Sequence, residues 1–333
     1  MTSPPADDEA MAAEQNGPVG KAPSRRPAWW QLLLLVGVGF VLAVLLYYPV
    51  GAWRAHVIDD DLTFAPADVA VGQSKAVATA AQLIRREIDG HGWTPNKPFF
   101  LPASILVSMP SFQRGMAVTI ERFVSEMALV IGRPAGDPDS SPELDPDLAR
   151  AAELMHYPAD VWMIDPAAPW ARTLSTEKQY RNAARGLESY NQRLLSGNAA
   201  FDREPTALRA VLDHLGRDLD DAAANLEEPI VAAHGWFGHS AAEVYYINKG
   251  KAYADLLLLR ALGEDCRPLL AERGLGPSWQ AMLATLTAAA APRPWVILNG
   301  GAASTFIPNH LASQGYYLMR ARARLSELSE ALR

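Results

Sequence analysis

Residues Trp29 to Val50 read WWQLLLLVGVGFVLAVLLYYPV, and no charged residue interrupts them. A helix needs about 20 consecutive apolar residues to cross the hydrocarbon core of a bilayer, so this stretch is long enough to span a membrane. Amphipathic aromatic rings prefer the headgroup level, and such rings stand at both ends of the stretch: Trp29, Trp30, Tyr47 and Tyr48. The pattern predicts one transmembrane helix over residues 29–50.

The charges on either side of this span predict its orientation. Three basic residues lie within residues 21–26, whereas Arg54 and then the aspartates of residues 59–61 follow the span. Basic residues collect on the cytoplasmic side of membrane helices. We therefore expect the N-terminus in the cytoplasm and everything from Gly51 onward outside the cytoplasm.

A cleaved signal peptide is the alternative interpretation, since Val50-Gly51-Ala52 has the small residues of a cleavage site. Two features argue against cleavage. The segment before the span contains four acidic residues, unlike a short basic leader, and the apolar run exceeds the usual length of about 7–15 residues. We expect a permanent anchor.

The composition narrows the class of protein. With 333 residues, the chain has room for one large or two small domains beyond the anchor. The formal net charge of -7 provides no basic surface for nucleic acid, so we expect no such partner. Hydrophobic residues make up 49% and charged residues 20%, as in a globular chain. The single cysteine, Cys266, cannot form an internal disulfide.

Along the chain, residues 1–28 lack apolar periodicity and predict a disordered cytoplasmic tail. Residues 51–65 are expected to form a juxtamembrane connector, and residues 66–333 an extracytoplasmic domain. The Pro- and Asp-rich stretch 132–146 marks a possible boundary inside that domain.

Helical periodicity dominates the domain, and the expected fold class is mainly all-α, a helical bundle behind one transmembrane helix. Ser74 and Ser175 are expected N-caps. Trp295 to Leu298 is a short apolar run that fits either a strand or a buried turn. The predicted helices cover Ser74–Asp89, Pro110–Ile131, Asp145–His156, Thr176–Leu195, Thr206–Leu226, Ser240–Leu262, Ser278–Ala290 and Ser313–Leu332.

The stretch Ser240–Leu262 is apolar nearly all round, which predicts a central buried helix. Glu243, Tyr246, Gly250 and Tyr253 share one of its faces. Because glycine inside a helix costs about 1 kcal/mol relative to alanine, we expect the backbone of a neighbouring helix to approach Gly250 closely.

Glu243 on a buried helix would have to be paired, hydrogen-bonded or protonated. Structural pairing is the favoured interpretation, and a ligand pocket is the alternative. The candidate partners are Lys249, Lys251, Arg122 and Arg320.

Strong catalytic motifs are absent from the sequence: it has no His-Glu-x-x-His, Walker loop, Gly-x-Ser-x-Gly or Cys-x-x-Cys. His234, His239 and Glu243 would offer a metal three ligands at best, and a Gly/aromatic loop before a helix explains them more simply. We assign no catalytic residue, no metal and no cofactor.

Four strings, in this order, resemble a family of proteobacterial membrane proteins that is catalogued as a domain of unknown function: Gly92-Trp-Thr-Pro-Asn96, Ser108-Met-Pro-Ser-Phe-Gln-Arg-Gly115, Ile297-Leu-Asn-Gly300 and Asn309-His310. The likeness extends from the anchor to the last helix and is weakest over residues 197–238. It implies one N-terminal transmembrane helix in the bacterial inner membrane and a mostly helical remainder in the periplasm, and it implies no activity.

The same strings, together with the face of the central helix, supply the candidate pocket or packing residues. We favour loops that join helices, and a shared polar pocket is the alternative. The candidates are Trp93, Asn96, Gln113, Glu243, Tyr246, Tyr253, Asn299 and His310.

We therefore expect a non-enzymatic envelope scaffold or adaptor. Its partners would be the lipid bilayer and either another envelope protein or a second copy of the chain. A ligand-binding sensor domain is the alternative, and an envelope hydrolase, with His310 or His239 beside a carboxylate or hydroxyl, a lesser one.

Overall fold

The computed structural model describes residues 28–132, 144–164, 170, 173–232, 239–294, 296–300 and 308–333. The chain divides into two compact units, Met1–Leu46 and Tyr47–Arg333. Across the described ranges the structure contains ten α-helices, α1 to α10, and no strand. The all-α prediction is confirmed.

The first helix, α1, covers Ala28–Ala55 and is long and apolar enough to cross a membrane. Apolar side chains from Trp29 to Leu46 are exposed on every side of it, so no protein surface covers this stretch within the described residues. The helix runs to Ala55, into the stretch that was expected to be a connector. The predicted disordered tail lies outside the described residues, apart from Ala28.

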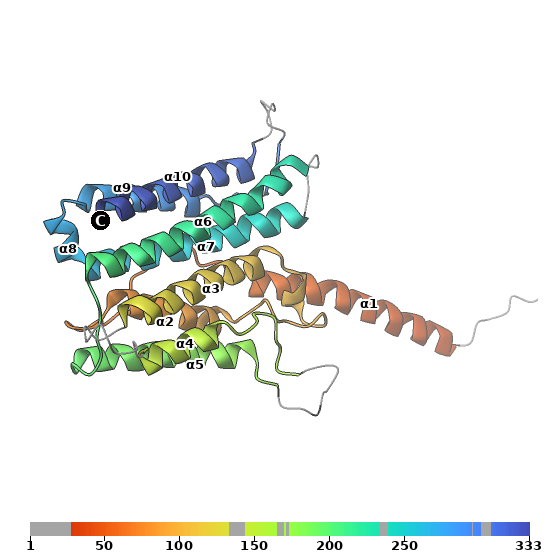
Figure 1. Cartoon of the computed structure of the whole chain (residues 1–333). Helices are drawn as coiled ribbons and strands as arrows, with labels where there is room; N and C mark the ends of the chain where they lie inside the picture. Colours follow the sequence, from red (N-terminus) through yellow and green to blue (C-terminus); the bar gives the residue numbers. More distant parts are fainter. Residues whose placement is uncertain are drawn as a thin grey trace, which may run out of the picture. The chain divides into compact units, whose positions relative to one another are not determined.

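Within the described residues, the second unit contains the helices α2 to α10, and all of them except the short α8 form two groups (Figure 1). In the first group, α2 and α4 pack on α5, and α3 packs on α4; in the second, α10 packs on α6 and α9, and α7 packs on α9. Contacts of α7 with α3 and α2 join the groups. The bounds are α2 Lys75–Arg85, α3 Ser108–Glu126, α4 Pro146–Met155, α5 Thr176–Leu195, α6 Pro205–Ala232, α7 His239–Asp265, α8 Arg267–Glu272, α9 Gly276–Ala290 and α10 His310–Ala331.

Local signals explain most of these boundaries. The side chains of Ser74 and Ser175 accept hydrogen bonds from the first turns of α2 and α5, as predicted. Two predicted helices end in a π-helical turn, Arg86–His91 after α2 and Met127–Ile131 after α3. The sequence pattern did not reveal α8 or the short 3-10 helix Pro102–Ile105.

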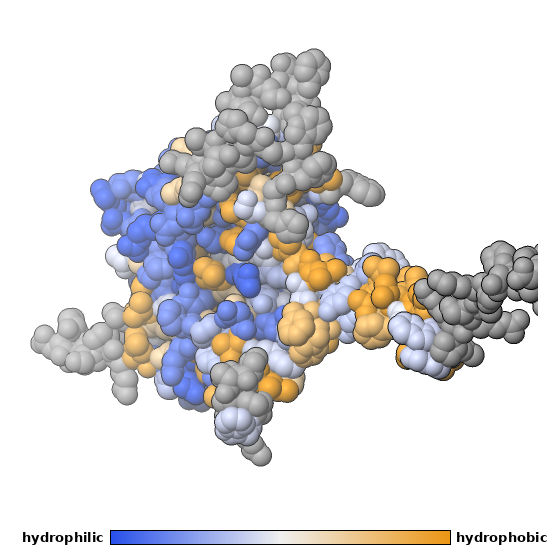
Figure 2. Space-filling view, turned by 90° about the vertical axis from the view of Figure 1, so that its right-hand side faces the viewer, coloured by the Kyte–Doolittle hydropathy of each residue, from blue (hydrophilic) through white to orange (hydrophobic). Residues whose placement is uncertain are grey.

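The apolar faces of the helices form one continuous core. Leu318, Ala321, Leu325 and Leu328 of α10 are buried and recur at heptad steps. The possible boundary at residues 132–146 stays a prediction, because residues 133–143 lie outside the described residues. Figure 2 shows a surface that mixes hydrophilic side chains with hydrophobic ones, the latter concentrated toward its right-hand half.

The crossing of α3 and α7 has the close backbone approach that was predicted at Gly250. A Cβ atom at Gly250 would overlap the carbonyl oxygen of Phe112, and one at Gly115 would overlap the carbonyl oxygen of Ile247. Both glycines therefore let two helix backbones touch, which no larger residue allows at this distance. The two groups of helices are joined at this crossing.

Candidate functional site

The segment Val57–Ala67, which follows α1, is held along its length by side chains from the helical domain; we refer to it as the juxtamembrane strap. Tyr253 donates to the carbonyl oxygen of Asp61 over 3.0 Å, and Arg260 donates to that of Leu62 over 2.6 Å and also to Phe64. Further bonds reach the carbonyl oxygens of Asp59 from Arg86, Asp60 from Arg293 and Ala67 from Gln82. The strap is neither helix nor strand, but its backbone is fixed because its carbonyl groups accept hydrogen bonds from side chains of the domain.

Asp60 forms the centre of this arrangement. Its carboxylate is 2.7 Å from Lys249 Nζ and 2.5 Å from Arg293 Nη2. Lys249 is fully buried, and its ammonium group donates also to the carbonyl oxygens of Ala290 at 2.8 Å and Pro292 at 2.6 Å. All three protons of the ammonium group are thus used, so Lys249 is a structural cation and not a free base.

The electrostatics agree with a permanent pair. Burial acts to raise the pKa of Asp60, but the hydrogen bonds from Arg293 and Lys249 outweigh it and hold the pKa below its usual value. Burial lowers the pKa of Lys249, and the hydrogen bond and the charge of Asp60 act against this shift. The carboxylate therefore stays ionised near neutral pH, and its neighbour donates to it as an ammonium group.

The other two aspartates of the strap have separate partners. Asp59 Oδ2 is 3.4 Å from Arg86 Nη1 and 3.2 Å from His91 Nε2. Asp61 Oδ1 accepts from the backbone and hydroxyl of Thr63, at 2.9 and 2.7 Å, which closes a local turn. Each consecutive carboxylate thus fixes a different part of the strap.

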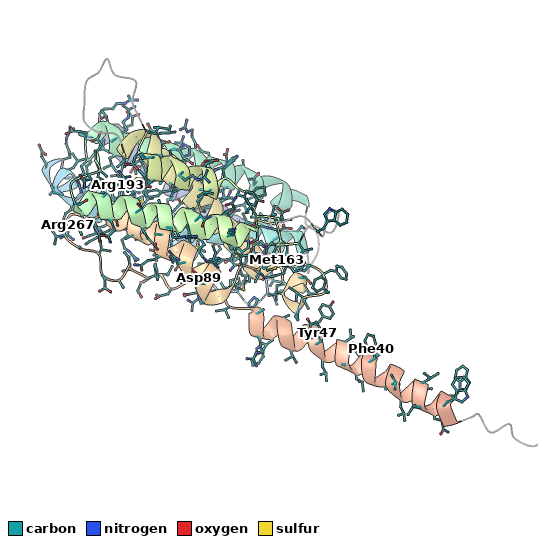
Figure 3. All side chains as sticks on the ribbon, turned by 90° about the horizontal axis from the view of Figure 1, so that it is seen from below. Phe40, Tyr47, Asp89, Met163, Arg193 and Arg267 are labelled. Carbon is teal, nitrogen blue, oxygen red and sulfur yellow. The ribbon has the colours of Figure 1, made fainter. Side chains whose placement is uncertain are left out.

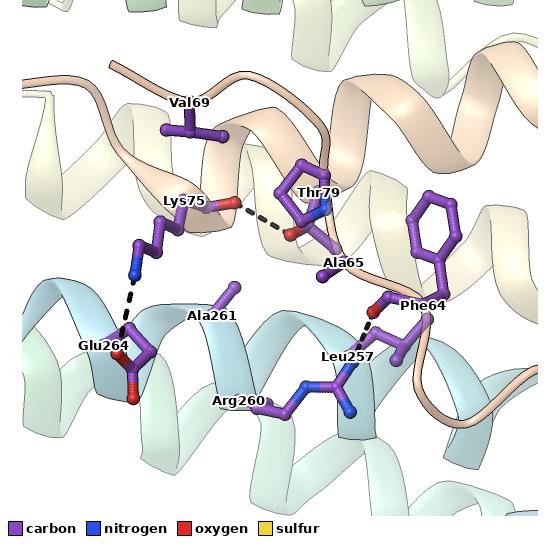
Figure 4. A pocket seen from close by; sticks show the side chains of 10 residues that line it. Phe64, Ala65, Val69, Lys75, Thr79, Leu257, Arg260, Ala261 and Glu264 are labelled. Atoms are coloured by element: carbon purple, nitrogen blue, oxygen red, sulfur yellow. Dashed lines mark hydrogen bonds and ion pairs between the residues drawn. The ribbon is translucent and has the colours of Figure 1, made fainter. Parts of the chain in front are cut away.

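Two surface cavities flank the strap. One has a volume of about 310 Å³ and is lined by Ile58, Asp59, Asp60, Asp61, Tyr246, Lys249, Arg293 and Pro294. The other, of about 370 Å³, lies between the strap, α2 and α7, with Lys75 paired to Glu264 and Arg260 bonded to Phe64 at its edge (Figure 4). In the first cavity the outward group is the guanidinium of Arg293, whose side chain is 68% exposed.

Two of the candidates, Trp93 and Asn96, lie in the loop that follows the π-helical turn Arg86–His91, where packing and hydrogen bonds hold them. Trp93 is buried against Tyr180, and its indole N–H donates to the carbonyl oxygen of Ala159 over 2.8 Å. Asn96 donates to the carbonyl oxygen of Val161 and to Glu177.

Gln113 is completely buried and joins that loop to α2 and α3. Its side-chain oxygen accepts from the backbone and hydroxyl of Thr94, and its nitrogen donates to Glu87 and Gly92. Burial raises the pKa of Glu87, since the charges and hydrogen bonds of its neighbours do not fully compensate for desolvation. The space around Gln113 amounts to a cavity of only about 10 Å³, so no room for a ligand lies there.

Glu243 is not buried as expected. Its side chain is 49% exposed, and its basic neighbour is Arg114, at 3.8 Å, instead of any of the four residues proposed from the sequence. The expectation was wrong because Glu243 lies in the first turns of α7, where neighbouring helices no longer cover that face. Tyr246 is half-buried on the Asp60 cavity, whereas Tyr253 is fully buried between Arg86 and the strap.

Asn299 and His310 meet where the chain enters α10. Asn299 pairs with Asn309 in an isolated antiparallel bridge, and Val296 to Leu298, the described part of the apolar run before it, form no strand. His310 Nδ1 accepts from the backbone N–H of Leu298 over 3.0 Å, and burial lowers the pKa of its imidazole. Both residues hold the backbone at the start of α10; His234 lies outside the described residues.

Of the eight candidates, only Tyr246 lines a cavity larger than 300 Å³ in the described parts of the chain. The strap residues were missed. The sequence did contain a signal: three consecutive aspartates, residues 59–61, and two lysines, Lys249 and Lys251, in an otherwise apolar helix. The aspartates were used only to predict the orientation of the membrane span. No group of metal-ligating side chains occurs among the residues that the structure describes.

Comparison of the chain with protein-family models, with curated proteins and with solved structures finds no match in any of the three. The likeness of the four sequence strings to a family of inner-membrane proteins therefore stays a prediction.

Proposed function

We propose that this chain is a single-pass inner-membrane protein that acts as a non-enzymatic scaffold, with its N-terminus in the cytoplasm and its helical domain in the periplasm. The clamped strap is the observation that supports this. A segment that is already ordered favours the binding of a partner, because the entropy cost of ordering it has been met before the partner arrives.

The compartment within this proposal depends on the basic flank of the span and on the likeness to proteobacterial inner-membrane proteins. Alkaline phosphatase fused after Arg333 is expected to be active, and a reporter that needs the cytoplasm is expected to be inactive at the same site. The reverse result would invert the orientation.

The scaffold role is tested by site-specific photo-crosslinking in intact membranes. Tyr316 and Met319 are 57% and 65% exposed on α10 and provide apolar positions for the crosslinker. Lys178, which is exposed in the first turn of α5, provides a polar control. A discrete adduct, either with another envelope protein or with a second copy, is expected from α10. Recovery of the monomer alone from every exposed site would contradict the proposal.

A ligand-binding sensor is the second candidate, and the Asp60 cavity favours it. Tyr246 and the exposed guanidinium of Arg293 would contact a small anion there, beside the strap that leads to the membrane. Thermal shift of the full-length protein in detergent, screened with carboxylate and phosphate compounds, tests this. Arg293→Gln should abolish any shift, while Arg150→Gln, at an exposed site on α4, should leave it unchanged.

A further inference from the structure

An uncharged apolar loop lies beside the C-terminal part of α1. The sequence from Pro98 to Gln113 contains no charged residue. Phe99 is 83% exposed, Phe100 45% and Ile105 52%, although each would normally be covered in a soluble domain. The ring of Phe100 also packs edge-on against that of Trp162, with 5.6 Å between the ring centroids. Met163, which follows Trp162 in the chain, is 57% exposed. We call Phe99, Phe100, Ile105 and Met163 the apolar rim.

Hydrogen bonds fix the position of this rim on α1. The hydroxyl of Tyr48 donates to the carbonyl oxygen of Phe99 over 2.9 Å, and that of Tyr47 to the carbonyl oxygen of Phe100 over 3.2 Å. A Cβ at Gly51 would overlap the ring of Pro102, so the loop lies directly against the helix. The rim is therefore level with the two tyrosines.

The tyrosines themselves mark the membrane boundary if α1 crosses the bilayer. From Trp29 to Tyr48 the helix rises by about 28 Å at about 1.5 Å per residue. This matches the hydrocarbon thickness of about 30 Å, so the aromatic pairs at the two ends fall at the two interfaces. A surface bonded to Tyr47 and Tyr48 must then lie in the headgroup region.

We propose that the apolar rim inserts into the headgroup region of the bilayer, as a second membrane contact beside the anchor. The partner is the lipid surface, because exposed aromatic and aliphatic side chains suit that region. Tyr47 and Met163 lie toward the same end of the unit, away from Arg193 and Arg267 (Figure 3). This inference rests on the anchoring in the proposed function and extends it, because two contacts fix the tilt of the domain.

Spin labels on single cysteines test the proposal in the full-length protein, reconstituted in phosphatidylethanolamine–phosphatidylglycerol nanodiscs. Cys266 needs no replacement, because it is buried, and burial raises the pKa of its thiol to about 12. The three positions are Phe99→Cys in the rim, Phe40→Cys in the span and Val71→Cys as the aqueous control. Val71 is 99% exposed, and its neighbour Gly72 lies against Leu195 at the Arg193 end of the unit.

Collision rates with oxygen, which dissolves in lipid, and with a water-soluble nickel complex report the surroundings of each label. We expect nickel contact at Phe99→Cys to be several-fold lower than at Val71→Cys, with oxygen contact raised toward that of Phe40→Cys. Nickel contact equal to that at Val71→Cys would overturn the proposal while leaving the anchor intact. Low contact with both reagents would indicate a protein surface, such as a second copy, and would overturn it as well.

Failure of the anchor gives a different result, namely free nickel contact at Phe40→Cys. A second variant keeps the test independent of the label at position 99. With the label at Ile105→Cys, the additional change Phe100→Glu should raise nickel contact, and no change in contact would again contradict insertion of the rim.

Discussion

The helices α1 and α7 have almost the same length, 28 and 27 residues, and both are apolar on most sides. Within its apolar run α1 has no charged residue, whereas α7 buries Lys249, Lys251 and Asp255. A bilayer offers no partner for a charge, but a protein interior does: Asp60 pairs with Lys249, and the charges of Asp255 and Asp218 favour the protonated form of Lys251. Buried polar groups thus distinguish a helix enclosed by protein from one exposed to lipid.

Of the variants that test this comparison, Lys249→Met is expected to have the largest effect, a loss in the free energy of unfolding. Removing one partner of a buried ion pair costs about 3–5 kcal/mol, because the remaining charge and the carbonyl groups of Ala290 and Pro292 lose their donor. The free energy of unfolding in urea, measured on the detergent-solubilised protein, gives the number. Lys75→Met is the matched control: its side chain is 50% exposed, and it should cost less than about 1 kcal/mol. Equal losses for both variants would contradict a structural role for the buried pair.

The second test places a charge in α1. Val38→Arg is expected to make membrane insertion about 2.5–3.5 kcal/mol less favourable, since the span has no partner for a guanidinium. The readout is the fraction of protein that resists carbonate extraction from membranes, compared with Val38→Leu. An unchanged fraction would mean that α1 does not span the bilayer.

The third test addresses how closely α7 is packed. Gly250→Ala should lower the free energy of unfolding by about 1–3 kcal/mol, because the new methyl group overlaps the carbonyl oxygen of Phe112. Gly216→Ala in α6 meets no atom within 4 Å and should instead stabilise by about 1 kcal/mol through helix propensity. The same sign of change for both variants would remove the argument for a tight α3–α7 crossing.

The smallest effect is expected at the open end of α7. Glu243→Gln should change the free energy of unfolding by less than about 1 kcal/mol, since its side chain is half exposed and Arg114 is 3.8 Å away. Chemical denaturation beside the wild-type protein measures this. A loss of several kcal/mol would show that Glu243 is covered after all.

Local signals in the sequence were sufficient for the helices. Ser175 and the periodicity behind it gave the bounds of α5 without error, and the glycine in α7 correctly predicted a close neighbour. Periodicity names the face of a helix but not how far a neighbour covers it, so Glu243 was placed in the interior. The first turn of α3 was placed at Pro110 although the helix begins at Ser108, a common uncertainty at helix ends.

The strap escaped prediction for a different reason. Four of its carbonyl groups bond to side chains that lie 192 to 233 residues later in the chain, as in Asp61 with Tyr253 and Asp60 with Arg293. Backbone acceptors have no sequence signature, and pairings of such separation follow only from the complete fold.

The distance in sequence between the strap and its clamp also sets an order of events during synthesis. Arg293 follows Asp60 by 233 residues, and ribosomes add roughly 5–20 residues per second, so the strap waits on the order of ten seconds or longer before its last partner exists. Gln82 and Arg86 are made soon after the strap, but Tyr253, Arg260 and Arg293 are made much later. The strap therefore gains its full set of hydrogen bonds only late in synthesis, after α7 and the residues that follow α9 have been made.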